Sequence, residues 1–146
     1  MRYHHTKNKG DLGVAKVIAD LIDKGYGILL PLSEHLPYDI VAADENGELI
    51  KIQAKYRSGE AISLRNQTSW ADKNGTHRVD YSPDAFDFFA AYSPKVEAVI
   101  YIHWNGNFKN LNIRTSLPNS ATLYYWYEDF TELTKTMPEK RKNDTI

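Results

Sequence analysis

Three polar residues near the middle of the chain have the types and spacing of a site that hydrolyses phosphate esters. Asp39 lies on one predicted strand, 38–43, and Gln53 and Lys55 lie on the next, 48–57. Carboxylate and amide oxygens are ligands that Mg²⁺ takes from proteins, and a lysine ammonium beside them can orient a water or offset charge on a phosphate. Phosphodiester hydrolysis needs these functions together. The residue types therefore predict a Mg²⁺ site, at which Mn²⁺ can substitute, beside a lysine.

The turn at 44–47, Asp-Glu-Asn-Gly, decides whether these residues meet. A two-residue Asn-Gly turn would pair Asp39 with Ala54, whose side chain lies on the opposite face of its strand. A three-residue loop that ends in a left-handed Gly47 pairs Asp39 with Gln53 instead. The second register also brings the apolar faces of the two strands together, so burial selects it. We therefore expect the acid and the amide on one face of a β-hairpin.

Asp11 is a further candidate oxygen ligand. It falls in a predicted helix, 10–24, on one face with the apolar residues Ala15, Ile18 and Ile22. We expect this face to pack against the sheet. An acid in the first turn of a helix also interacts favourably with the helix dipole, which would explain Asp11 without a ligand role. Its place on an apolar face favours a contact with the metal, either direct or through water.

The remaining apolar runs predict one domain, 1–146, of the α/β or α+β class. Further strands and a second helix are expected, at 26–32, 60–64, 86–92, 96–104, 108–115 and 123–133. Residues 65–82 are polar and basic, and we interpret them as a loop excursion. The order of a helix, then strands, then a helix indicates a single domain of the α+β or mixed α/β class.

The excursion and the strand before it carry side chains that commonly contact DNA phosphates and base edges. The candidates are Lys51, Arg57, Arg65, Asn66, Gln67, Lys73, His77 and Arg78. An ordinary solvated loop has a similar composition, and the net charge of −1 gives no basic surplus over the whole chain. We expect these residues to bind double-stranded DNA.

Composition and the lengths of the apolar runs indicate the cellular location to expect for the protein. The chain has no cysteine, which excludes disulfides and thiolate metal sites. No apolar run approaches the roughly 20 residues that span a bilayer, and the first residues lack the apolar stretch of a signal peptide. A cytoplasmic protein without a membrane partner is therefore expected.

The ordered motifs resemble a known family. Asp39 followed by Gln53-Ala54-Lys55 resembles the Asp-Xn-(Asp/Glu/Gln)-x-Lys core of the PD-(D/E)XK nuclease superfamily. Other stretches are similar to its small branch of homing endonucleases encoded in group I introns. They lie at residues 6–13, 36–39, 52–56, 69–75 and 87–92.

This resemblance implies a restriction-endonuclease-like fold, with a central mixed β-sheet flanked by helices. It also implies Mg²⁺-dependent cleavage of double-stranded DNA at a specific site. It also implies a homo-oligomer, a dimer or tetramer, that presents paired active sites. It assigns catalysis to Asp11, Asp39, Gln53 and Lys55, and metal binding to the first three. Asp11 is one methylene shorter than the glutamate often found there, and Gln53 replaces the acid of many members. A junction-resolving or repair nuclease and a catalytically silent nucleic-acid-binding module are the alternatives.

Overall fold

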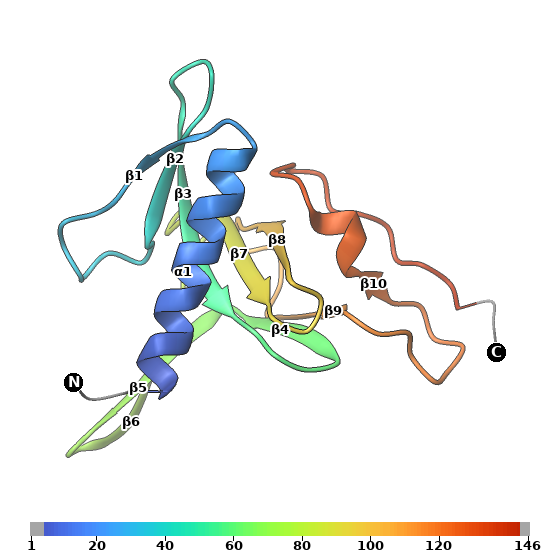
Figure 1. The fold of residues 1–146 in the computed structure, drawn as a ribbon. Coiled ribbons are helices and arrows are strands. Elements are labelled where there is room, and N and C mark those ends of the chain that lie inside the picture. Colours follow the sequence, from blue (N-terminus) through green and yellow to red (C-terminus); the bar gives the residue numbers. More distant parts are fainter. Residues whose placement is uncertain (1–4, 144–146) are drawn as a thin grey trace.

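A computed structural model describes residues 5–143 of the chain, and its centre is a five-stranded mixed sheet (Figure 1). Helix α1 (His5–Asp23) precedes this sheet, whose strands have the order β1–β2–β3–β7–β8. β3 and β7 run parallel, and the other neighbouring strands are antiparallel. No helix in the described part of the chain is long and apolar enough to cross a membrane. The five strands are β1 (Gly27–Leu29), β2 (Ile40–Ala43), β3 (Leu49–Tyr56), β7 (Phe88–Ser93) and β8 (Ala98–His103).

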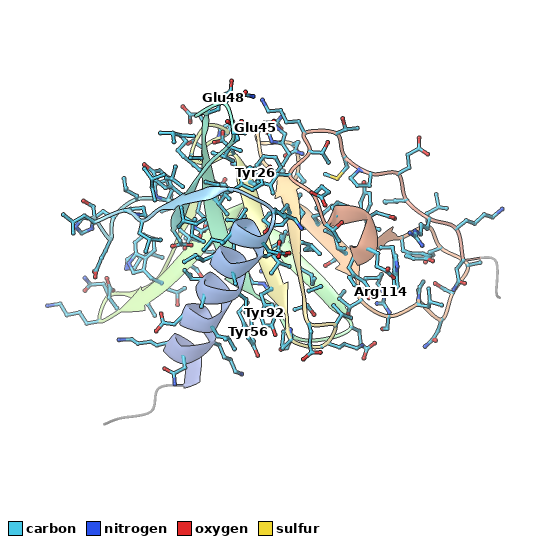
Figure 2. The ribbon with its side chains drawn as sticks, turned by 45° about the horizontal axis from the view of Figure 1, so that its top comes forward. Tyr26, Glu45, Glu48, Tyr56, Tyr92 and Arg114 are labelled. Atoms are coloured by element: carbon cyan, nitrogen blue, oxygen red, sulfur yellow. The ribbon has the colours of Figure 1, made fainter. Side chains whose placement is uncertain are left out.

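Helix α1 covers one face of the sheet. Its fully buried residues Val17 and Leu21 belong to the same core cluster as Ile40 and Ile52. Figure 2 shows Tyr56 and Tyr92, the last residues of this face, beside the N-terminal half of α1. The helix approaches β3 closely at Gly13, where an added Cβ atom would lie 3.2 Å from the carbonyl oxygen of Lys55, a tight contact. The Ile-rich face of β3 is therefore the face under the helix.

The expected orientation of α1 is wrong. Ala15 and Ile22, which share a helix face with Asp11, are exposed, and so is Asp11 itself. The helix buries Gly13, Val17 and Leu21 instead, at intervals of four residues. Both of these helix faces carry apolar residues. The close approach of Gly13 to β3 determines that the face with Gly13, Val17 and Leu21 packs on the sheet.

A second sheet, rather than a helix, covers the other face of the central sheet. It has the order β10–β9–β4, and its residues Ile62 and Ile113 join a core cluster with Phe89 and Ile102 of the central sheet. The prediction of a helix at 123–133 is wrong. This stretch forms strand β10 and a short 3₁₀ helix, η1, which buries Phe130. Residues 5–143 therefore hold one α-helix, on one side of the sheet only. These elements are β4 (Ala61–Arg65), β9 (Asn110–Arg114), β10 (Tyr125–Trp126) and η1 (Tyr127–Phe130).

The excursion predicted as a loop is a two-stranded hairpin. Strands β5 (Gln67–Asp72) and β6 (Gly75–Asp80) pair along their whole length, so the loop assignment is wrong. Most of their residues are exposed on both faces, and the hairpin projects from the body of the molecule in both views (Figures 1 and 2). A ribbon that is solvated on both faces needs no alternation of polar and apolar residues, which is why the sequence pattern did not indicate strands.

Candidate active site

The site begins where β2 separates from β3. Ile40 pairs with Ile52 and Ala42 with Ile50, which confirms the predicted register and the three-residue loop with a left-handed Gly47 (φ 78°). β2 begins at Ile40, and the amide of Asp39 before it still donates to the carbonyl oxygen of Ile52 at 2.9 Å. The side chain of Asp39 also pairs with β3, since its Oδ2 accepts a hydrogen bond of 2.9 Å from the Ala54 amide. The acid is therefore held by the backbone of the strand that carries Gln53 and Lys55.

Asp39 and Gln53 each have one atom anchored and one oxygen left over. Gln53 donates from Nε2 to the carbonyl oxygen of Pro37 at 2.8 Å, which orients the amide. Among the described residues, neither Gln53 Oε1 nor Asp39 Oδ1 receives a hydrogen bond. These two hard oxygens suit Mg²⁺, which binds through one or two carboxylates and keeps several waters. They are the atoms that would hold a metal ion here.

The candidate metal site has few protein ligands. Among residues 5–143, no group of three or more His, Cys, Asp or Glu side chains is placed to share a metal ion. One carboxylate and one amide are too few to satisfy a cation without water or substrate oxygens. The arrangement suits a metal whose remaining positions are filled by water and a phosphate, as hydrolysis requires.

The electrostatics of the site favour a bound cation. Burial raises the pKa of Asp39 above its ordinary value, against the opposing effects of the Ala54 amide and the positive charge of Lys55. Burial also lowers the pKa of Lys55, as does the neighbouring charge of Arg57, while Asp39 opposes both. The negative charge of Asp39 and the positive charge of Lys55 are therefore only partly stabilised by other groups of the protein. A divalent cation would compensate the carboxylate.

Lys55 contacts a residue that the sequence reasoning did not single out. Its Nζ lies 3.4 Å from the hydroxyl of Tyr81, which is only partly exposed. Tyr81 follows β6 directly, and its ring packs edge-on against Phe86 and Phe89. Nothing in the local pattern distinguishes this tyrosine from the other nine of the chain, because its role depends on a contact across 26 positions of sequence.

A cleft opens beside these residues. It is an open hollow of about 430 Å³ between the segment before β2, the centre of β3 and the base of the β5–β6 hairpin. Gln53 lines it together with Tyr81, and Lys55 reaches Tyr81 from the next outward position of β3. The other lining residues are His35, Leu36, Pro37, Thr68, Val79, Asp80, Ser82 and Ala85.

Asp11 is the predicted site residue on α1, and its side chain is exposed. The side chains of Gln53 and Lys55 lie on the face of β3 opposite Ile52 and Ala54, and α1 packs against the face with Ile52. Asp11 is exposed on the helix and makes no hydrogen bond or ion pair among the described residues. The expectation that it lies on a buried face is wrong, whereas its assignment to the metal site stays a prediction. Because α1 begins at His5 and has no acid in its first turn, Asp11 lies too far along the helix for the helix dipole to explain its presence.

The residues expected to contact DNA divide into two groups. Lys51 and Arg57 bind carbonyl oxygens of the protein, at Asp84 for the lysine and at Ser63 and Tyr56 for the arginine. The other group lies on or next to the β5–β6 hairpin, where His77 stacks on Trp70 and contacts Asp72 at 3.0 Å. This group consists of Arg65, Asn66, Gln67, Lys73, His77 and Arg78, of which Arg65, Lys73 and Arg78 are exposed.

Comparisons with known proteins identify the family of the chain and a solved structure with a similar fold. Residues 4–133 match a family model described as PD-(D/E)XK endonuclease. The fold is similar to the solved structure of a bacterial homing endonuclease, I-Ssp6803I, with a TM-score of 0.66 and 24% identity over 82% of this chain and 84% of that one. No curated protein matches the sequence. Since the family model covers most of the chain, the protein belongs to the PD-(D/E)XK endonucleases.

Proposed function

We propose that this nuclease cuts double-stranded DNA at a specific site in a Mg²⁺-dependent reaction, as a homing-type endonuclease. The observation that carries the proposal is the pair of unengaged oxygens, Asp39 Oδ1 and Gln53 Oε1, beside the Lys55 ammonium. A divalent cation held there supplies Lewis acidity and lowers the pKa of a bound water. Mn²⁺, which also accepts oxygen ligands, would replace Mg²⁺.

The protein side chains have separate tasks in this reaction. Asp39 and Gln53 fix the cation relative to β3, because each is anchored through its other polar atom. Lys55 places its positive charge where the scissile phosphate gains negative charge, or orients the attacking water. Burial strengthens this interaction, since the screening by water is weaker there.

The β5–β6 hairpin is the proposed reader of the DNA target. A two-stranded ribbon fits the major groove of B-form DNA, and this one is exposed and projects from the body (Figure 1). Its base borders the cleft that holds Gln53, so DNA bound along the ribbon lies next to the candidate active site. The solved homing endonuclease with the similar fold supports a DNA substrate. We further propose a dimer or tetramer, since cutting both strands requires two active sites or two successive reactions.

Selection from a randomised duplex library tests the function. Incubation with Mg²⁺ is expected to enrich cleaved duplexes that share one sequence, and chelation of the metal is expected to stop the reaction. Cleavage of four-way junctions in preference to linear duplex would point to a junction-resolving nuclease. DNA binding without cleavage under any metal condition would point to a silent binding module.

Replacing Arg78 by alanine is expected to weaken DNA binding and to reduce the salt dependence of the affinity by about one unit of log–log slope. Arg78 is an exposed cation on β6. Binding isotherms at several salt concentrations provide the measurement. Arg114→Ala is the matched control, because Figure 2 places Arg114 on the side of the molecule away from the hairpin. An unchanged slope in Arg78→Ala would remove this residue from the interface.

A further inference from the structure

Tyr81 joins the base of the β5–β6 hairpin to the catalytic strand. It follows Asp80, the last residue of β6, which pairs with Gln67 at the start of β5. Its amide donates to the carbonyl oxygen of Asn66 at 2.7 Å, so the hairpin closes across the two residues that enter and leave it. The backbone of Tyr81 therefore moves with the hairpin.

The Tyr81 hydroxyl connects two elements. It lies 3.4 Å from Lys55 Nζ on one side, at the long end of the hydrogen-bond range. On the other side it faces Thr68, one residue into β5, which lines the same cleft and whose side chain lowers the pKa of this tyrosine against the larger effect of burial. Tyr81 therefore lies between the hairpin and the catalytic lysine.

The ring of Tyr81 is held in place by the core. Phe86 and Phe89 contact it edge-on, with centroid distances of 5.0 and 6.0 Å. Lys55 Nζ lies 5.8 Å from the centroid of the same ring. The position of the hydroxyl is therefore set by buried aromatic packing, and not by a flexible side chain.

Lys55 needs such a partner. A lysine side chain has four rotatable carbons and loses considerable entropy when it is fixed. Among residues 5–143, Lys55 takes part in no ion pair, and Tyr81 is its hydrogen-bond acceptor. A catalytic ammonium that is misplaced by about 1 Å loses much of its effect.

We propose that Tyr81 is a positioning residue that holds the Lys55 ammonium in place through its hydroxyl, and that Thr68 makes this placement depend on the β5–β6 hairpin. DNA that seats on the hairpin would then set the lysine at the scissile phosphate. The catalytic role of Lys55 in this proposal rests on the function proposed above, whereas the contact between the two side chains does not.

The test uses Tyr81→Phe, which keeps the ring and removes the hydroxyl. The single-turnover rate of cleavage is expected to fall about tenfold, the effect of losing one hydrogen bond of ordinary strength. The dissociation constant for DNA, measured with Ca²⁺ in place of Mg²⁺, is expected to stay unchanged. Tyr26→Phe is the control, since Tyr26 packs in the cluster on the α1 side of the sheet.

A second variant separates positioning from general stability. Thr68→Val removes the other hydroxyl and is expected to slow cleavage in the wild-type background but not in Tyr81→Phe, because both act through one contact. Equal slowing by Thr68→Val in both backgrounds would contradict the dependence of the lysine on Thr68. A wild-type cleavage rate in Tyr81→Phe would overturn the positioning role.

A spectroscopic measurement tests the contact without cleavage. The ¹³Cε signal of Lys55, assigned by its absence in Lys55→Arg, is expected to report a more mobile side chain in Tyr81→Phe and an unchanged one in Tyr26→Phe. An unchanged Lys55 signal in Tyr81→Phe would refute the inference even if the enzyme cuts DNA. If the wild-type protein cuts no DNA but Lys55 becomes more mobile in Tyr81→Phe, the proposed function is refuted. The contact by which Tyr81 positions Lys55 is then still supported.

Discussion

Replacing Lys55 by alanine is expected to lower the single-turnover rate of DNA cleavage by about 10²- to 10³-fold, the usual effect of removing one preorganised charge from a transition state. The reason is its place beside Asp39 and Gln53 on the polar face of β3, where burial limits screening by water. DNA affinity, measured with Ca²⁺, is expected to change little. Rapid-quench cleavage assays and binding isotherms on the same variant supply the two numbers.

The control for this variant is Lys95→Ala. Lys95 pairs with Glu60 at 2.8 Å and does not line the cleft, so its removal is expected to leave the rate unchanged. A Lys55→Ala enzyme that cuts at the wild-type rate would show that the reaction uses another group. A loss of affinity with an unchanged single-turnover rate at saturating enzyme would instead place Lys55 among the groups that only bind substrate.

Replacing Asp39 by asparagine is expected to stabilise the metal-free protein and to abolish its stabilisation by Mg²⁺. Burial disfavours the ionised carboxylate of Asp39, which is why its pKa is raised. Asparagine removes the buried charge and keeps an oxygen that accepts from the Ala54 amide. In chelator at neutral pH, the variant is therefore expected to unfold at a higher temperature than the wild type. In the wild type, Mg²⁺ at about ten times its dissociation constant is expected to add about 1.4 kcal/mol, a shift of a few degrees.

The raised pKa of Asp39 also makes the stability of the metal-free protein depend on pH. A carboxyl whose folded pKa lies above its unfolded value binds its proton more tightly in the folded state. Its contribution to stability is therefore present below the ordinary value of 3.8 and is lost as the pH rises through the raised folded value. Asp39→Asn is expected to lack this loss. A variant no more stable than the wild type in chelator, with an unchanged response to Mg²⁺, would contradict the role of Asp39 as the metal carboxylate.

The β2–β3 hairpin was predictable because the decisive information is local. The choice between pairing Asp39 with Ala54 or with Gln53 depends on four turn residues and on which register buries the flanking apolar side chains. Both kinds of evidence lie within about twenty residues of sequence. The structure has the expected register, with Gly47 left-handed and Ile40 opposite Ile52.

The predictions that were wrong concern features that depend on contacts between residues far apart in the sequence. Asp11 was placed by helical periodicity, which leaves two apolar faces open, and the packing of Gly13 on Lys55 chooses the other one. The aromatic stretch before Phe130 resembles one face of a helix, but it pairs with β9 and packs into the core between the sheets. Tyr81 could not be selected, because its partner Lys55 lies on a separate strand.

Asp39 Oδ1 and Gln53 Oε1 are proposed to hold one divalent cation beside Lys55. Anomalous diffraction from crystals grown with Mn²⁺ and DNA would locate this cation. We expect a Mn²⁺ peak within about 2.5 Å of both oxygens, and no such peak in Asp39→Asn. A peak bound by other side chains, with these two oxygens turned away from it, would show that the metal site lies elsewhere.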